Sequence, residues 1–343
     1  MTGKELFKMM ADGKMPPRIP FVPTIYEHAA KVIGQPVSRL CQDADLLVAA
    51  QLKCYEIYRH DLIVLGVDIY NVEYEAMGAR FEYFDDQRLP ETRDLLVTGT
   101  EDLEALKIPD PEKDGRMPVF LAAAERIKKE VGDEVGVSGT VIGPFTLAAI
   151  ARGYESFILD MIEDPDFAHA QLKFALQVGL TYGKAFVDRG LSVAINESWI
   201  APPLLSPAFY KDFAAPYERE LISGLKAYGA SSVNLISGGD TTPIVAEMAK
   251  TGTSLLMCDY KNDRRLFTQI CREHDIFLRT SIQSRTVAAG TDDEIYEETQ
   301  AVLADCAGYY KFIMGCGVVG YDTEPARVIK FREMIKELNP RKL

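Results

Sequence analysis

Basic residues are scarce in this 343-residue sequence. It contains 38 Lys and Arg against 51 Asp and Glu, which gives a formal net charge of −13 at pH 7. Nucleic-acid surfaces and sites that attract polyanions depend on an excess of positive charge. The composition therefore argues against a nucleic-acid partner and against a polyanionic substrate drawn in by the overall charge.

Long apolar runs are also missing. No run approaches the roughly 18 residues that a membrane-spanning helix needs. The first residues, MTGKELFKMMADGK, mix charges of both signs and lack the continuous apolar segment of a signal peptide. We expect no membrane association and a cytoplasmic location.

The six cysteines show no CxxC pair and no regular spacing. A disulfide framework is therefore not expected in a chain of this length, and most cysteines should be buried, reduced thiols. Neither GxGxxG after the first predicted strand nor GxxxxGK[ST] is present, which argues against the main nucleotide-binding folds.

Strand-like and helical segments alternate along the chain on short loops, a pattern typical of parallel strands joined by helices. We expect eight strands, at residues 19–25, 65–72, 135–141, 191–198, 232–236, 253–260, 276–282 and 311–317. That count favours a closed barrel over an open doubly wound sheet. The predicted fold is α/β, a single (β/α)8 TIM barrel spanning 1–343, with an N-terminal helical extension (1–19) and an insertion near the barrel mouth (79–113).

The run SVNLISGGDTTP, residues 232–243, is the first candidate site. Val233, Leu235 and Ile236 suit a buried strand, and the following Asp-Thr-Thr-Pro suits a helix start. In a barrel this is the ligand-facing end of a strand. A tight turn without chemistry is the alternative interpretation.

The other predicted strand ends carry polar groups that would meet at the same mouth. Carboxylates there could transfer protons, and a thiolate could bind a metal. Glu73 and Glu75 would face one side of an extended segment, or be solvated rim groups. His28 could equally be a surface or capping residue. The complete set is Tyr26, His28, Glu73, Glu75, Asn196, Glu197, Asn234, Ser237, Asp259, Gln283 and Cys316.

Several stretches resemble the uroporphyrinogen decarboxylase superfamily, and most closely its corrinoid-dependent methyltransferase branch. They are VEYEAMGARFEY, GTVIGPFTLAAIARGYESFILDMIEDPD, LSPAFYKDFAAPYERELI, SGGDTTPIV, the Cys258-Asp259-Tyr260-Lys261 segment and IMGCGVVGYDTEPARVIKF. The resemblance covers nearly the whole chain. It implies a (β/α) barrel that moves a methyl group to or from the cobalt of a corrinoid carried by a separate small protein.

Two departures from the family patterns narrow the activity. The decarboxylases have arginines and a QAGRY-like run after the first strand, where this chain has FVPTIYEHAAK, and their late Gly-His is Gly315-Cys316 here. The methylcobalamin:coenzyme M methyltransferases have a His-x-Cys zinc motif, and alignment on TTP puts Ile236 and Gly238 at those two ligands. Since zinc activates a thiol by holding it as thiolate, thiol methylation is disfavoured.

The expected activity is therefore transfer of a methyl group from a small methylated substrate, such as an aryl methyl ether, to a corrinoid protein. A decarboxylase of a small acid and a non-catalytic ligand-binding barrel are the alternatives. Zinc is doubtful, because Cys316 could be a metal ligand or an inert buried thiol. A homodimer is left open. The expected catalytic residues are Glu197, Glu73, His28 and Tyr26, and the expected substrate-binding residues are Asn196, Asn234, Ser237, Gly238, Asp259 and Gln283.

Overall fold

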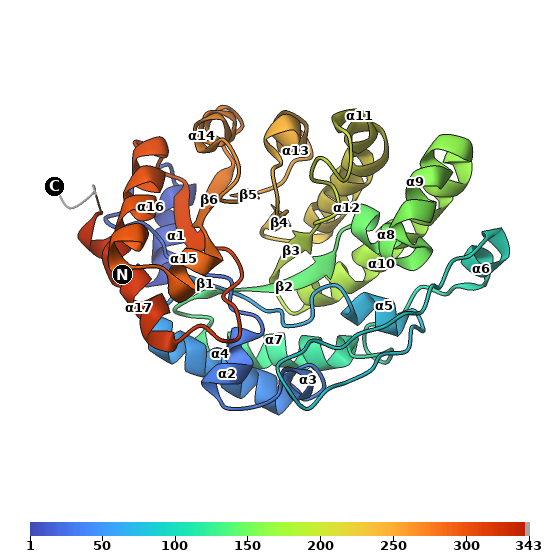
Figure 1. The fold of residues 1–343 in the computed structure, drawn as a ribbon, viewed down its shortest axis with the longest axis horizontal. Coiled ribbons are helices and arrows are strands. Elements are labelled where there is room, and N and C mark those ends of the chain that lie inside the picture. The colour runs from blue at the N-terminus through green and yellow to red at the C-terminus, as the bar shows by residue number, and fades with distance from the viewer. Residues whose placement is uncertain (340–343) are drawn as a thin grey trace.

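Seven parallel strands form one curved sheet in the computed structural model, which describes residues 1–339. Their spatial order follows the sequence, β1-β2-β3-β4-β5-β6-β7, and helices lie on the outer side of the sheet (Figure 1). The strands are β1 Leu62–Val64, β2 Gly136–Ile142, β3 Ser192–Asn196, β4 Val233–Ile236, β5 Leu255–Cys258, β6 Phe277–Ile282 and β7 Phe312–Cys316. The predicted barrel fold is confirmed.

An extended segment at residues 20–24 takes the eighth position, between β7 and β1. Phe21 bridges Met314 of β7, and its carbonyl accepts a 2.8 Å hydrogen bond from the Asp61 amide. Pro20 and Pro23 have no N–H to donate, so a continuous ladder cannot form. The strand predicted at 19–25 is therefore wrong as regular secondary structure, although the segment lies where a strand was expected.

The strand predicted at 65–72 is also wrong. β1 ends at Val64, and the chain turns before helix α5, Val72–Ala76. Asp68 lies within this apolar run, and its buried carboxylate pairs with Arg116 at 2.8 Å. Because a buried charge needs a partner, the run follows that ion pair instead of a regular strand.

The helices cover the sheet and its two ends. α1 has a capping box formed by Thr2 and Glu5, and its Met10 packs with Val22, Leu255 and Ile313 in a small apolar cluster inside the barrel. The helices are α1 Gly3–Ala11, α2 His28–Val32, α3 Val37–Leu40, α4 Ala44–Tyr58, α5 Val72–Ala76, α6 Thr100–Ala105, α7 Met117–Val131, α8 Pro144–Arg152, α9 Tyr154–Glu163, α10 Pro165–Asp188, α11 Pro207–Phe209, α12 Ala215–Tyr228, α13 Val245–Ala249, α14 Arg264–Glu273, α15 Ser284–Ala289, α16 Asp292–Asp305 and α17 Pro325–Glu337.

Strand alternation decides which side chains face the barrel interior. Ala194 of β3 is in register with Asn234 of β4, which is in register with Leu255 of β5, and all three line the interior. Their neighbours along the strands, such as Val193 and Leu235, are buried in the large core between the sheet and the helices. This alternation places the polar groups considered below.

The segment at 79–113 leaves the barrel wall after α5. Glu82 and Glu91 form an isolated antiparallel bridge. The amides of Leu96 and Val97 both donate to the carbonyl of Ala151 at the end of α8. The segment is thereby attached to the helix that follows β2.

Within residues 1–339, no helix has the length and apolar character needed to cross a membrane.

Candidate functional site

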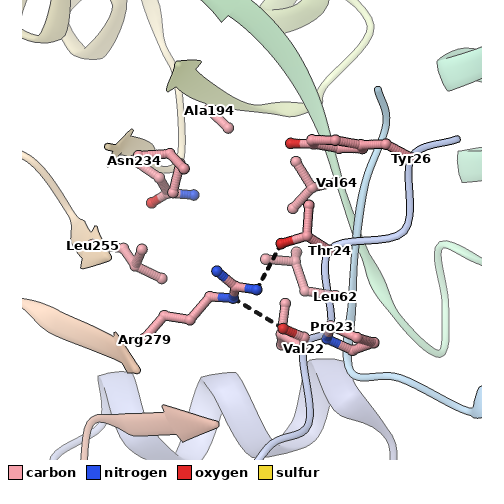
Figure 2. A pocket seen from close by; sticks show the side chains of 11 residues that line it. Val22, Pro23, Thr24, Tyr26, Leu62, Val64, Ala194, Asn234, Leu255 and Arg279 are labelled. Atoms are coloured by element: carbon pink, nitrogen blue, oxygen red, sulfur yellow. Dashed lines mark hydrogen bonds between the residues drawn. The ribbon is translucent and has the colours of Figure 1, made fainter. Parts of the chain in front are cut away.

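A small cavity lies inside the barrel, against the extended segment. Its volume is about 20 Å³, enough for one water-sized group. Figure 2 shows side chains from several strands and from the extended segment around it. The lining residues are Val22, Pro23, Thr24, Tyr26, Leu62, Val64, Ala194, Asn234, Ile236, Leu255 and Arg279.

Arg279, in the middle of β6, is the cation of this cavity, and its side chain is buried. Nε donates to the Val22 carbonyl at 2.9 Å, and Nη2 donates to Thr24 Oγ1 at 2.7 Å and to the Cys316 carbonyl at 2.8 Å. Nη1 lies 3.0 Å from Met257 Sδ, a weak acceptor. These bonds join β6 to the extended segment and β7, where the prolines prevent a regular ladder.

Sequence reasoning missed Arg279. The signal was nevertheless present, because a single charged residue stands at the centre of the otherwise apolar strand IFLRTSI. Burial lowers its pKa from the usual value, but an arginine starts so high that it remains charged.

Tyr26 lines the same cavity. Burial raises the pKa of its phenol well above the usual value of 10. The hydroxyl therefore stays protonated at neutral pH and can donate a hydrogen bond. Figure 2 shows it across the cavity from Asn234.

Two further buried polar groups face the barrel interior by strand alternation. Asn196 is in register with cavity-lining Ile236, and Ser281 is two residues beyond Arg279 on β6. Asn196 Nδ2 and Ser281 Oγ both lack hydrogen-bond partners in the described part of the chain. Since buried polar atoms are normally paired, these two point to a ligand or ordered water.

The loop after β4 is fixed by the loop after β5. Asp259 Oδ2 accepts a 3.0 Å bond from the Gly239 amide, and Asn262 Oδ1 accepts a 2.6 Å bond from the Thr241 amide. A Cβ on Gly238 would lie 4.0 Å from Asp259 Oδ2. The structure thus places Gly238 and Gly239 beside Asp259.

Glu197 lies on the other face of the wall. It follows Asn196, so alternation turns it outward, where Oε1 accepts from the Thr146 amide at 2.6 Å and Oε2 from the Phe145 amide at 3.3 Å. These amides form the N-terminus of α8, which favours a negative charge. Burial nevertheless raises the pKa of Glu197 to about 7.

A second buried carboxylate, Glu218, acts on Glu197 from α12, and sequence reasoning missed it. Burial, and then repulsion from Glu197, raise the pKa of Glu218 well above its usual value. Tyr210, in a π-helical turn at Tyr210–Ala214, donates to Glu218 Oε2 at 2.7 Å. Repulsion between the two buried carboxyls therefore favours the protonated form of Glu218 at neutral pH.

Glu73 and Glu75 do not end a strand, because both lie on the short helix α5. Glu73 accepts a 2.7 Å bond from the Ile142 amide at the end of β2, and burial raises its pKa to about 8. Glu75 instead pairs with Arg116 and accepts from the Tyr83 hydroxyl at 2.5 Å. The expectation that they face one side is wrong, since their partners lie in different directions.

His28 is completely buried at the start of α2, so the surface alternative is wrong. Its Nε2 lies 2.6 Å from the Tyr58 hydroxyl of α4. Burial lowers its pKa to about 4, which leaves the ring neutral at pH 7. His28 is not among the residues that line the cavity described above.

The residues do not fit a zinc site of the kind expected in this branch. The side chain of Cys316 belongs to the outer core, and burial raises its thiol pKa to about 11. No group of three His, Cys, Asp or Glu side chains within residues 1–339 could hold a metal ion. Gln283 follows β6 and is the N-cap of α15. Its backbone N–H donates a 3.0 Å hydrogen bond to Glu298 Oε2.

Comparison with known proteins places this geometry in a family. The sequence model described as uroporphyrinogen decarboxylase (URO-D) matches residues 2–338. A methylcobamide:CoM methyltransferase, MtbA of Methanosarcina mazei, is 27% identical over 77% of this chain and 76% of its own length. A uroporphyrinogen decarboxylase of Chlorobaculum parvum is 24% identical over 87% and 86% of the two chains.

A solved structure, a methyltransferase from Methanosarcina mazei, matches with a TM-score of 0.86. The match covers 98% of this chain and 99% of that one, at 24% sequence identity. At that level of identity the agreement establishes the fold.

Proposed function

We propose, because the chain belongs to the uroporphyrinogen decarboxylase family, that this barrel transfers a methyl group from a small methylated substrate to a corrinoid protein. The proposal follows the similarity to the methylcobamide:CoM methyltransferases. The direction of methyl transfer, from the substrate to the corrinoid, is inferred from the corner after β4. Ile236 and Gly238 stand there, and neither can bind a metal that would activate a thiol acceptor.

The corrinoid is proposed to belong to a partner protein, as the resemblance to the corrinoid-dependent methyltransferase branch implies. When bound, it supplies a cobalt nucleophile that accepts the methyl group. The chain's own residues must then bind the donor and assist its leaving group. A homodimer is compatible with this proposal but is not required by it.

An aryl methyl ether is the proposed donor type. As the methyl group leaves, the C–O bond breaks, its electron pair stays on oxygen, and the new phenolate takes up a proton. A phenolate leaves poorly unless a donor stabilises the developing charge on its oxygen, and the released phenolate then takes its proton from solvent. We assign the donor role first to Tyr26, whose protonated hydroxyl faces the cavity and can donate a hydrogen bond to that oxygen.

The glutamates are weaker candidates for direct proton transfer. With pKa values of about 8 and about 7, Glu73 and Glu197 hold protons near neutral pH. Their carboxylate oxygens, however, accept hydrogen bonds from the backbone amides of Ile142 and Thr146. Neither glutamate lines the cavity. Asn196 and Asn234 are proposed to orient the donor, and Ser237, Gly238 and Asp259 to shape the mouth.

The test is to mix the purified protein with a cobalt(I) corrinoid protein and a panel of methyl ethers, and to follow the absorbance of the methylated corrinoid. Tyr26→Phe should slow transfer at least tenfold. Tyr296→Phe, at an exposed tyrosine of α16, is the matched control and should leave the rate unchanged. If the wild-type protein forms no methylated corrinoid with any ether of a broad panel, the proposal is wrong.

A decarboxylase of a small acid is the second candidate, and Arg279 favours it. A buried guanidinium can hold a carboxylate, and decarboxylases are among the relatives. Carbon dioxide release in the absence of any corrinoid would identify this activity.

A further inference from the structure

The charge of Arg279 is not balanced by any nearby acid within residues 1–339. Its four hydrogen-bond acceptors, which are two carbonyls, one hydroxyl and one thioether, are all neutral. Asp259 acts on it only through the longer-range field, and the oxygens of Asp259 are bonded to the amides of Gly239 and Tyr260. A buried charge without a counter-ion is costly, and in native proteins it normally has a partner.

The donor count shows where that partner would bind. A guanidinium has five N–H groups. Nε and Nη2 use three of them on Val22, Thr24 and Cys316, and Nη1 has only the sulfur of Met257 for its two. In Figure 2 the nitrogen without a dashed line points into the open space toward Asn234.

The cavity has room for one oxygen atom of an anionic group. Its volume of about 20 Å³ suits one water-sized group, so the rest of a ligand would extend toward the mouth. Tyr26 offers a protonated hydroxyl at the cavity wall. The unpaired Nδ2 of Asn196 offers another donor near the strand ends.

We propose that Arg279 binds an anionic oxygen group of the substrate, a carboxylate, inside the barrel, and so selects methyl donors that carry a negative charge. Only the assignment of this anion to the methyl donor rests on the function proposed above. The site predicts that a neutral ether such as anisole is a poor ligand. It also explains how a strongly acidic protein can bind an anion, because the cation is inside the barrel and not on the surface.

Binding can be measured without a corrinoid, by titration calorimetry with 4-methoxybenzoate, its neutral amide 4-methoxybenzamide, anisole and formate. We expect the carboxylate to bind at least tenfold more tightly than the amide or anisole. Arg279→Gln should remove that preference. Arg327→Gln is the matched control, because its Nε also bonds a backbone carbonyl, that of Val287, on the outer helices, and it should bind like the wild type.

Four results would overturn the site. The first two are equal affinity for the carboxylate and the amide, and unchanged carboxylate binding by folded Arg279→Gln. The other two are that formate binds while 4-methoxybenzoate does not, and that no anion binds at all. If Arg279→Gln does not fold, the wild-type preference for carboxylate over amide decides alone. Anion binding without methyl transfer would refute the proposed function but not the site, whereas efficient demethylation of neutral ethers would refute the site but not the function.

Discussion

Replacing Glu73 with Gln should remove a pH-dependent loss of stability. Glu73 is 2% exposed, and burial raises the pKa of its carboxyl from 4.5 to about 8. The folded state therefore binds more protons than the unfolded state between these values, and stability must fall as the pH rises through that window. Gln is neutral at every pH, and its amide oxygen can still accept the hydrogen bond from Ile142.

The size of the effect follows from these two pKa values. Between pH 6 and pH 9 the wild type should lose about 3 kcal/mol of unfolding free energy relative to the variant. Unfolding entropies of about 2.1 cal/mol/K per residue then convert this difference into about 4 °C for a chain of 343 residues.

The assay is thermal unfolding of both proteins, followed by circular dichroism at pH 6, 7, 8 and 9. The melting temperature of the wild type should fall more steeply with pH than that of Glu73→Gln. Parallel pH profiles would refute the reasoning, because they would mean that Glu73 is ionised in the folded protein throughout this range.

Three other substitutions probe the remaining contacts. Gly143→Ala should cost about 1 to 3 kcal/mol, since its Cβ would clash with the buried carboxylate of Glu197, and thermal unfolding would measure the loss. Arg116→Gln should cost about 3 to 5 kcal/mol, because it leaves the buried carboxylate of Asp68 unpaired; denaturant unfolding would measure it. Cys316→Ala should keep methyl transfer within about twofold, since this thiol belongs to the outer core and does not line the cavity, and a group must be within reach of the reacting atoms to act on them.

Each substitution has an informative control or contrary result. Gly99→Ala meets no atom within 4 Å and should be tolerated. Arg80→Gln removes an exposed ion pair with Asp94 and should cost less than about 1 kcal/mol. Loss of both activity and bound zinc in Cys316→Ala would contradict the outward placement of the thiol and restore a metal mechanism.

Most of the fold could be predicted because its local signals agree with its tertiary contacts. The strand at Ser192–Asn196 and the helix at Pro165–Asp188 have clear periodicity and short connections. The run at 65–72 misled because its structure depends on Asp68 and Arg116, which are far apart in sequence. No local pattern reports that ion pair.

The candidate site was predicted less completely. Tyr26, Asn234 and the corner at Ser237–Gly238 lie near the interior or mouth, as strand ends should. Glu197 could have been placed on the outer face from the sequence, because it directly follows inward-facing Asn196. Glu218 could not have been placed, since only the packing of helix α12 brings it to Glu197.

The proline-containing segment at residues 20–24 has a consequence for how the chain folds. Its contact with β6, between Val22 and Arg279, closes a loop of 257 residues, and contacts of such long range are slow to form. Until it forms, β1 and β7 are open strand edges that can pair with other chains. The guanidinium of Arg279, which also faces the cavity, helps to close these edges through its hydrogen bonds to Val22 and Thr24.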